Sequence, residues 1–231
     1  MKVHALIPAA GAGRRMGGDT SKQYLALAGR PILAHTLTLF QNHPSIDNIV
    51  LIAPSEEIPF CRNDIVTPLH FDKVSQIVAG GEERQDSVRN GLQACGAAAD
   101  DIILIHDGVR PLLPCELIDA AIATAADTGA SLVAVPAKDT IKIVDQGKVV
   151  QTPDRSTLWQ AQTPQAFRCQ IIASAHEKAY KEGYRATDDA QLAEWTGHPV
   201  TVVPGSYQNL KITTPEDLLL AESFLAQNKG K

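Results

Sequence analysis

The sequence predicts an α/β fold in which a mostly parallel, twisted sheet lies between two layers of helices. Short apolar runs rich in Val and Ile recur along the chain without strict alternation, which is typical of strands buried on both faces. Segments with apolar residues at helical spacing lie between most of these runs. Alternating strands and helices form βαβ units, whose right-handed crossovers place helices on both faces of the sheet.

The predicted strands begin near the start of the chain. They are the runs Val3–Pro8, Asn48–Pro54, Val74–Gly80, Asp101–Asp107, Ser131–Pro136 and Pro199–Pro204. Helices are predicted around apolar residues spaced by three or four positions, namely Leu33, Leu37 and Phe40, then Val88, Leu92 and Cys95, then Ile118, Ile122 and Ala125. A last helix is predicted after Thr214, which can cap it, because Pro215 suits a first helical turn.

One stretch, Lys138–Thr152, interrupts the alternation of strands and helices. Two short polar-apolar segments flank Asp145–Gly147, which is typical of a β-hairpin with Gly147 in its turn. A two-stranded hairpin is marginally stable alone, so we expect it to join its own sheet or to contact another subunit. No repeat or linker separates independent domains, so residues 1–231 are expected to form one domain.

The composition excludes several classes of protein. Apolar residues make up 44% and charged residues 20%, which argues against long disordered segments. A net charge of −5 and only 2 Trp, 4 Tyr and 5 Phe argue against a nucleic-acid-binding protein. No targeting segment is evident, and no run approaches the ~20 apolar residues of a membrane span. Scattered cysteines without a C-x-x-C pair fit a cytoplasmic protein that lacks a structural zinc site.

Positive charge is concentrated at the beginning of the chain. Residues 1–30 carry a net charge of +4, because Lys2, Arg14, Arg15, Lys22 and Arg30 face Asp19 alone, so the rest of the chain carries −9. This asymmetry indicates a local site for a small anion. The alternative interpretation is that these side chains are ordinary surface charges.

The glycine-containing loop after the first predicted strand, Pro8–Gly18, differs from two common phosphate-binding loops. A P-loop requires Lys where Asp19 follows Gly18. A dinucleotide fingerprint requires a third glycine where Met16 stands, and an acidic residue about 20 positions further on, where Gly29–Leu33 has none. The P-loop interpretation is therefore excluded, and the dinucleotide fingerprint fits poorly, which weakens the case for an NAD-dependent dehydrogenase.

The residues that this loop does contain favour a triphosphate. Small residues let the backbone approach a ligand closely, and successive N–H groups form an anion-binding concavity. Arg14 and Arg15 can hold phosphate oxygens in bidentate fashion, and Lys22 adds a point charge.

The segment Gly11–Met16, with its G-x-G-x-R-M pattern, and the following Lys22 resemble the sugar-phosphate nucleotidyltransferases. Further motifs narrow the resemblance to the 2-C-methyl-D-erythritol 4-phosphate cytidylyltransferase family of the non-mevalonate isoprenoid pathway. In chain order these motifs are Gly80–Val88, Ile105–Pro111, Lys138–Thr140, Thr163–Gln165, Thr187–Asp189 and Asn209–Thr213. Their order and spacing resemble the family from Pro8 to about Ala221, and the ordered set is more specific than any single motif.

The resemblance implies a Rossmann-like nucleotidyltransferase that transfers a cytidylyl group from CTP to a polyol phosphate, 2-C-methyl-D-erythritol 4-phosphate. It also implies that Arg15 and Lys22 bind the triphosphate, and that Asp107 lies beside Mg²⁺ or another divalent cation. The substrate-binding residues that it implies around the nucleotide are Ala9, Ala10, Gly11, Gly13, Gly81, Glu82 and Ser87. Glu82 departs from the family pattern, since Asp is often found at this position.

On the acceptor side, the resemblance implies that Lys211, Thr140 and Arg155 hold the methylerythritol phosphate. In the family, the last two residues belong to an arm of the partner subunit. The resemblance therefore implies a homodimer with shared active sites, whose dimerisation arm is the predicted hairpin and its flanks, about residues 138–157.

Several of these residues also have simpler interpretations. Asp107 can cap the turn after its strand, and Ser87 can be an ordinary helix residue. Arg110 is expected to be a structural brace, and His106 a hydrogen-bonded interior residue and not a base. Thr187–Asp189 is expected to begin a helix, with Thr187 as its cap.

The implied reaction needs cations more than it needs a base. A phosphate monoester has a second pKa of about 6, so the acceptor is already mostly dianionic at pH 7. Accordingly, the motifs contain neither a Ser-His-Asp set nor a carboxylate pair. Two alternatives remain, namely a ribitol-5-phosphate cytidylyltransferase and a non-catalytic nucleotide-binding protein of the same fold. Lys211 argues against the second, because a nucleotide sensor needs no cation on the acceptor side.

Overall fold

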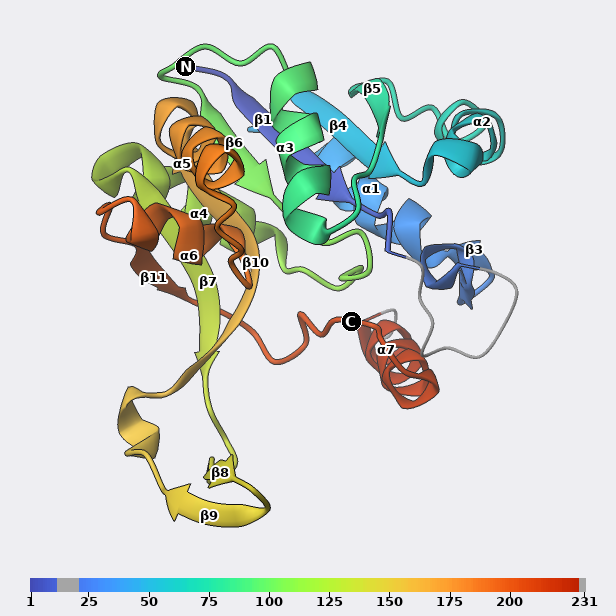
Figure 1. Ribbon diagram of the computed structural model, residues 1–231. Helices are drawn as coiled ribbons and strands as arrows, with labels where there is room; N and C mark the ends of the chain where they lie inside the picture. The colour runs from blue at the N-terminus through green and yellow to red at the C-terminus, as the bar shows by residue number, and fades with distance from the viewer. Residues whose placement is uncertain (12–20, 229–231) are drawn as a thin grey trace.

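The computed structural model describes residues 1–11 and 21–228, whose main feature is a seven-stranded sheet (Figure 1). Its strands are β1 (Val3–Pro8), β4 (Asn48–Ala53), β5 (Val74–Ala79), β6 (Ile102–Ile105), β7 (Ala130–Pro136), β10 (Trp159–Arg168) and β11 (Thr201–Pro204). They lie in the order β11-β7-β10-β6-β1-β4-β5. Neighbouring strands are parallel except at β10, which is antiparallel to both β6 and β7. The mostly parallel α/β sheet predicted from the sequence is confirmed.

Helices cover both faces of this sheet (Figure 1). One layer contains α1 (Ile32–Asn42) and α4 (Cys115–Thr128), and the other contains α3 (Arg84–Ala94), α5 (Cys169–Glu182) and α6 (Asp189–Trp195). Successive strand residues alternate between the layers, so that Ala5 and Ile7 pack with α1 while Leu6 packs with α3. Burial on both faces explains why the strands are continuous apolar runs.

Strand β10 is a strand of the sheet that the sequence analysis did not predict. It is rich in Gln and contains Pro164, and proline within a strand usually marks an edge or a bulge. The register between β10 and β7 shifts between Ala161 and Gln165, so Pro164 lies in an irregular stretch of a central strand. Hydrophobic periodicity therefore gave no strand signal here.

The predicted hairpin is confirmed and extends away from the sheet between β7 and β10 (Figure 1). Its strands, β8 (Ile143–Asp145) and β9 (Lys148–Gln151), pair only with each other among the described residues. The turn consists of Gln146 and Gly147, both with positive φ, as a two-residue hairpin turn of type I′ requires. Many apolar side chains of this arm are exposed, including Ile141, Ile143, Val144, Val149 and Val150.

The remaining elements are short or lie at the C-terminal end. They are β2 (Ala26–Leu27), β3 (Arg30–Pro31), α2 (Ile58–Phe60) and α7 (Pro215–Asn228). Helix α7 begins as predicted, because Thr214 Oγ1 accepts a hydrogen bond from the N–H of Asp217 at 3.4 Å. In the described parts of the chain, no helix has the length and apolar character needed to cross a membrane. All four cysteines are free.

Candidate active site

A cleft of about 300 Å³ lies beyond the carboxyl ends of β1, β5 and β6. Parallel α/β sheets commonly bind ligands at this edge. Nine of the predicted site residues line the cleft, namely Ala9, Ala10, Gly11, Lys22, Gly81, Glu82, Ser87, Asp107 and Lys211. Two others, Gly13 and Arg15, fall outside the described residues. The last two, Thr140 and Arg155, belong to the arm and its base and do not line this cleft.

Small residues bring the backbone segments around the cleft close together. The N–H of Ala9 donates to the carbonyl oxygen of Ile52 at 2.7 Å, which fixes the start of the loop after β1. A Cβ atom on Gly80 would lie 2.4 Å from that of Ala10, and one on Gly108 would lie 3.0 Å from that of Ala9. Side chains at these glycines would therefore push the loops apart and change the cleft.

Ser87 fixes the loop that leads from β5 into α3. Its side chain is buried, and its Oγ accepts the N–H of Gly81 at 3.0 Å and donates to the carbonyl oxygen of Glu83 at 3.1 Å. Glu83 caps α3, and its own N–H donates to Asp86 at 3.2 Å. Ser87 is thus more than an ordinary helix residue, because its hydroxyl holds the backbone of the loop that lines the cleft.

Lys22 lies on a short 3₁₀ turn, Lys22–Tyr24, which is attached to the segment before β5. Ser21 Oγ donates to Glu57 Oε1 at 2.7 Å, and the hydroxyl of Tyr24 lies 3.1 Å from Cys61 Sγ. Burial and the contact with Cys61 raise the pKa of Tyr24 far above its ordinary value, so its hydroxyl stays protonated. These contacts anchor the turn that places Lys22 at the cleft.

Asp107 lies directly after β6 and makes ionic contacts with three cationic side chains. Its carboxylate accepts a hydrogen bond from Arg84 Nε at 3.2 Å and contacts Lys211 Nζ at 2.8 Å, while Arg110 Nε lies 3.7 Å away. Burial alone would raise the pKa of Asp107, but the charges of Arg84, Lys211 and Arg110 outweigh it and hold the pKa well below its ordinary value. Asp107 is therefore an anion.

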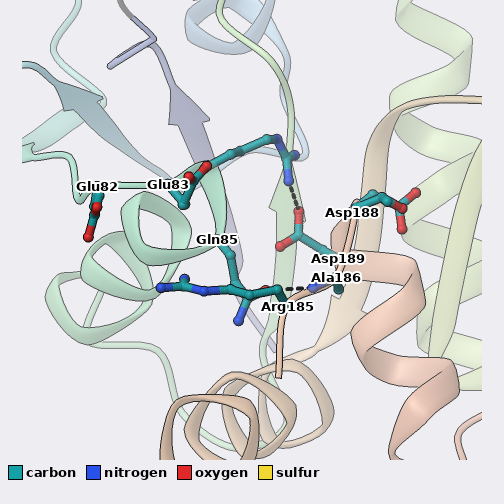
Figure 2. Close-up of a pocket in the computed structure, with 9 residues that line it drawn as sticks. Glu82, Glu83, Gln85, Arg185, Ala186, Asp188 and Asp189 are labelled. Atoms are coloured by element: carbon teal, nitrogen blue, oxygen red, sulfur yellow. Dashed lines mark hydrogen bonds and ion pairs between the residues drawn. The ribbon is translucent and has the colours of Figure 1, made fainter. Parts of the chain in front are cut away.

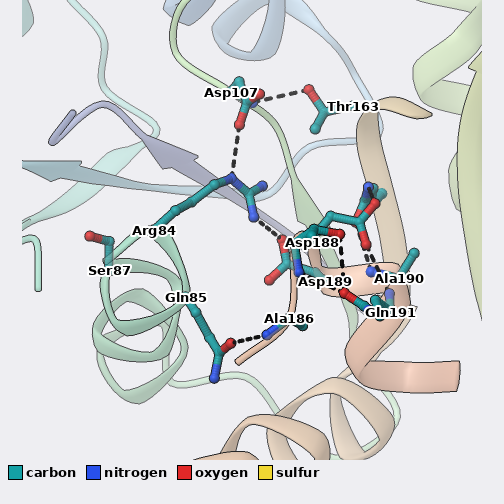
Figure 3. A network of polar contacts seen from close by, with 12 residues as sticks. Arg84, Gln85, Ser87, Asp107, Thr163, Ala186, Asp188, Asp189, Ala190 and Gln191 are labelled. Carbon is teal, nitrogen blue, oxygen red and sulfur yellow. Dashed lines mark hydrogen bonds and ion pairs between the residues drawn. The ribbon is translucent and has the colours of Figure 1, made fainter. Parts of the chain in front are cut away.

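Arg84 also reaches a second buried carboxylate, that of Asp189 (Figure 3). Arg84 Nη1 donates to Asp189 Oδ2 at 2.7 Å, and the other oxygen of Asp189 lies 3.0 Å from His176 Nε2. Burial would raise the pKa of Asp189, but Arg84 and then His176 lower it below the ordinary value. One guanidinium thus joins Asp107 after β6 to Asp189 at the start of α6.

Arg84 lies within the motif Gly80–Val88, but the sequence alone gives it no role. A signal for it exists, because Arg84 is the first residue of α3, where the helix dipole disfavours a cation. A cation at that position indicates a specific acidic partner. The sequence predicts Asp189 only as part of a helix start, whereas the structure shows its side chain 1% exposed and paired with Arg84.

The predicted cap of α6 is wrong by one residue. Asp188, not Thr187, is the cap, and its Oδ1 accepts the N–H of Gln191 at 2.9 Å. The Thr187 hydroxyl instead bonds to the side chain of Gln191 at 3.1 Å. Asp and Thr are both good N-cap residues, so the sequence alone does not decide which of these two neighbours begins the helix.

A second cleft, of about 340 Å³, shares Glu82, Glu83 and Arg84 with the first. Its opposite wall is the segment from Arg185 to Asp189 (Figure 2). Gln85 Oε1 accepts the N–H of Ala186 at 2.9 Å and holds this wall to α3. The pair of Arg84 and Asp189 therefore stands in the wall of this second cleft, while Arg84 also lines the first.

His106 is fully buried and hydrogen-bonded, as predicted. Its Nε2 faces the carbonyl oxygen of Arg110 at 3.0 Å and so carries the proton, which leaves Nδ1 to accept from the hydroxyl of Thr163 at 3.1 Å. Burial lowers the pKa of His106 to about 4. With both nitrogens occupied, His106 is not placed to act as a base. Arg110 is the expected brace, because its Nη1 donates to the carbonyl oxygen of Asn209 at 2.7 Å.

Comparisons with known proteins show the family of the chain. Residues 3–227 match the family model for 2-C-methyl-D-erythritol 4-phosphate cytidylyltransferase. The chain is similar to proteins of that name from Syntrophotalea carbinolica, at 59% identity over 97% of both chains, and from Geobacter metallireducens, at 55% identity over 98% of this chain and 99% of the relative.

Solved structures give the same result. The chain is similar to the 4-diphosphocytidyl-2C-methyl-D-erythritol synthase of Anaerococcus prevotii, with a TM-score of 0.83 and 34% identity over 97% of this chain and 96% of that one. It is also similar to the cytidylyltransferase of Francisella tularensis, with a TM-score of 0.83 and 32% identity over 96% and 99% of the two chains. This chain belongs to the 2-C-methyl-D-erythritol 4-phosphate cytidylyltransferase family.

Proposed function

We propose that the first cleft binds CTP and 2-C-methyl-D-erythritol 4-phosphate together and catalyses the cytidylyl transfer for which the family is named. The observation that supports this most directly is the presence of Lys22, Asp107 and Lys211 in one cleft, beside a backbone-lined pocket. An oxygen of the acceptor phosphate attacks the α-phosphorus of CTP. The bond between that phosphorus and the bridging oxygen breaks, and pyrophosphate leaves with the electron pair.

The nucleotide side of the cleft is formed mainly by backbone. Ala9, Ala10 and Gly11 follow β1, and Gly81 and Glu82 follow β5. We assign cytosine and ribose to this pocket, where small residues allow the backbone to approach the ligand closely. Ser87 supports the assignment through its hydrogen bond to the N–H of Gly81, which fixes one wall. The longer carboxylate of Glu82, in place of the more usual Asp, is exposed at the edge of the pocket.

In this proposal, catalysis depends mainly on positively charged side chains that stabilise the transition state. Lys22 stabilises the negative charge that grows on the α-phosphate during attack, together with Arg15, which lies outside the described residues. The acceptor phosphate needs no general base because its second pKa is about 6. His106 is neutral, and both of its ring nitrogens are engaged in hydrogen bonds. This is consistent with a reaction that relies on positioning and electrostatics.

Mg²⁺ is the divalent cation that this chemistry would use, and Asp107 is the carboxylate placed to hold it. Among residues 1–11 and 21–228, no three His, Cys, Asp or Glu side chains gather into a metal site made by protein alone. Mg²⁺ is usually held by one or two carboxylates together with substrate phosphates, so a single ligand such as Asp107 fits an ion that arrives with the nucleotide. Such an ion supplies positive charge that offsets the charge of the phosphates.

The acceptor side is completed by a second subunit in our proposal. Lys211 lies in the cleft, whereas Thr140 and Arg155 belong to the arm, where Arg155 Nη1 donates to the carbonyl oxygen of Lys138 at 3.0 Å. The exposed apolar side chains of the arm favour a protein partner, because they gain from burial. A homodimer in which each arm, residues 138–157, reaches the partner's cleft would bring these residues to Lys211.

A screen for released pyrophosphate tests the proposal. Four nucleotides (CTP, ATP, GTP and UTP) are combined with methylerythritol phosphate or ribitol 5-phosphate in the presence of Mg²⁺. We expect turnover with CTP and methylerythritol phosphate alone. Turnover with ribitol 5-phosphate and none with methylerythritol phosphate would contradict the acceptor assignment. Tight CTP binding without turnover on any acceptor would favour a nucleotide sensor.

A further inference from the structure

The three cations around Asp107 differ in their freedom to move. The side chains of Arg110, Arg84 and Lys211 are 10%, 29% and 39% exposed. Arg110 is tethered to Asn209, and Arg84 is tethered to Asp189. Lys211 is the most exposed of the three, and within the described part of the chain its ionic contact is with Asp107 alone. It is therefore the cation best placed to leave Asp107 for an incoming phosphate.

The departure of Lys211 leaves a buried carboxylate behind. Asp107 is 6% exposed, and a buried charge that loses an ionic partner is destabilised. Arg84 limits that cost because its Nε remains on Asp107 at 3.2 Å, closer than Arg110 Nε at 3.7 Å. A hydrogen bond from Arg84 Nη1 to Asp189 fixes the position of this guanidinium. Asp189 is itself held by His176, whose Nε2 lies 3.0 Å from its other carboxylate oxygen.

We propose that Arg84 is a positioning residue for acceptor binding, held by the buried Asp189, which keeps Asp107 compensated and in place so that Lys211 is free to bind the acceptor phosphate. This inference rests on the proposed function, since it takes Lys211 as the acceptor's cation. Without Arg84, Asp107 holds Lys211 more strongly, and the acceptor must compete with that carboxylate. The defect of an Arg84 variant therefore appears in acceptor binding, and only through Lys211.

The test measures affinity for methylerythritol phosphate in the presence of an unreactive α,β-methylene analogue of CTP. Arg84→Gln should weaken acceptor binding by about 10- to 100-fold, the value of a hydrogen bond to a charged group, and should change affinity for the CTP analogue much less. Arg84→Lys keeps the charge but cannot reach both carboxylates, so it should restore only part of the affinity. Asp189→Asn should give a smaller loss, because Arg84 then keeps its contact with Asp107.

Arg89→Gln is the matched control. Arg89 lies on the same helix and pairs with Glu177 on α5 at 3.6 Å, so its loss also removes an ion pair between helices, but it does not line the cleft. We expect wild-type affinity for the acceptor from this variant. A loss equal to that of Arg84→Gln would contradict the proposal, since it would reflect general loosening of α3.

A double variant distinguishes this proposal from the proposed function. In a Lys211→Ala background, Arg84→Gln should cause no further loss of acceptor affinity. Arg84 acts by leaving Lys211 free to bind the acceptor, and that lysine is absent in this background. Full additivity of the two losses would overturn the role of Arg84 while leaving the proposed function intact. Unchanged acceptor affinity in Lys211→Ala alone would contradict the proposed function itself. Thermal unfolding of every variant identifies any that fails to fold. If Arg84→Gln does not fold, the acceptor affinities of Arg84→Lys and Asp189→Asn are compared with that of the wild type instead.

Discussion

His106 and Asp107 are neighbours in the chain and are also joined through the hydroxyl of Thr163. That hydroxyl accepts the N–H of Asp107 at 3.1 Å and donates to Nδ1 of His106 at the same distance. The arrangement requires a neutral imidazole, because a protonated Nδ1 cannot accept a hydrogen bond. The backbone of the acidic residue at the cleft is therefore positioned, through Thr163, by a neutral histidine that does not itself line the cleft.

This relationship predicts a pH-dependent stability. The pKa of His106 is lowered by burial from 6.5 to about 4, so the unfolded chain binds this proton more tightly than the folded protein does. Stability is therefore lost as the pH falls from about 6.5 toward 4, and the loss from this group should reach about 2 kcal/mol between pH 7 and 4.5. Asp107 and Asp189 have lowered pKa values, so their contribution is lost only at more acidic pH.

Denaturant unfolding of His106→Gln from pH 8 to 4.5 measures this contribution. The amide of Gln can still donate to the carbonyl oxygen of Arg110 but does not titrate. The stability curves of the two proteins should run parallel above pH 7 and diverge below it, with the shallower decline in the variant. A variant that shows the full wild-type decline would rule out His106 as the source.

Lys22→Ala should lower kcat much more than it weakens CTP binding. In the proposed mechanism, the charge of Lys22 acts on negative charge that grows in the transition state, and such interactions appear in kcat. The loss should be ~2.7–4 kcal/mol, by analogy with the removal of an oxyanion donor. Steady-state kinetics and CTP titration measure the two quantities, and Lys181→Ala, an exposed lysine on α5, is the control. A normal kcat with only a raised KM would contradict this role.

Ser87→Ala should weaken CTP binding with little effect on the fold. The substitution removes the acceptor of the Gly81 N–H, so the loop that lines the nucleotide pocket loses a hydrogen bond with a net value of about 0.5–1.5 kcal/mol. Calorimetric titration with CTP should show a corresponding loss of affinity. Ser174→Ala removes a serine from α5 whose Oγ donates to the carbonyl oxygen of Ile171, and it should bind CTP as the wild type does. Equal effects of both substitutions would show that the Ser87 contact has no specific role.

Mixing two inactive variants tests the shared active site. Lys22→Ala and Arg155→Ala are combined in equal amounts after reversible dissociation. If the two residues act across the subunit boundary, each mixed dimer has one site with both defects and one intact site. Half of the dimers are mixed, so about a quarter of the wild-type activity should return. No recovery despite demonstrated subunit exchange, or a monomer in solution, would contradict the shared site.

Periodicity predicted those parts of the fold whose residues carry a strong apolar pattern. β1 has the predicted bounds, and the hairpin has the predicted turn at Gly147. By contrast, β10 has no clear apolar pattern, so periodicity does not predict it. Its hydrogen bonds to β6 and β7 stabilise it as a strand. Tertiary context overrides local pattern in such a strand.

The site was predictable to a similar degree. Residues on the loops after β1, β5 and β6 meet at one edge because parallel strands end there, and the ordered motifs singled them out. The partnership of Arg84 with Asp189 was not predictable, since 105 positions separate the two residues and only the folded chain brings them together. Buried ion pairs between distant segments leave no periodic signal in a sequence.

The place where the arm joins the sheet has a practical consequence. The chain leaves β7 at Pro136 and re-enters at Trp159, and these residues are paired in register, while the N–H of Ala137 donates to the carbonyl oxygen of Leu158 at 2.9 Å. In topological terms, the arm is a long insertion into an ordinary antiparallel hairpin. A tight turn can replace it without a cut through the sheet. The whole arm can equally be exchanged with that of a relative, so that a single graft replaces both Thr140 and Arg155, the residues that we propose reach the neighbouring subunit.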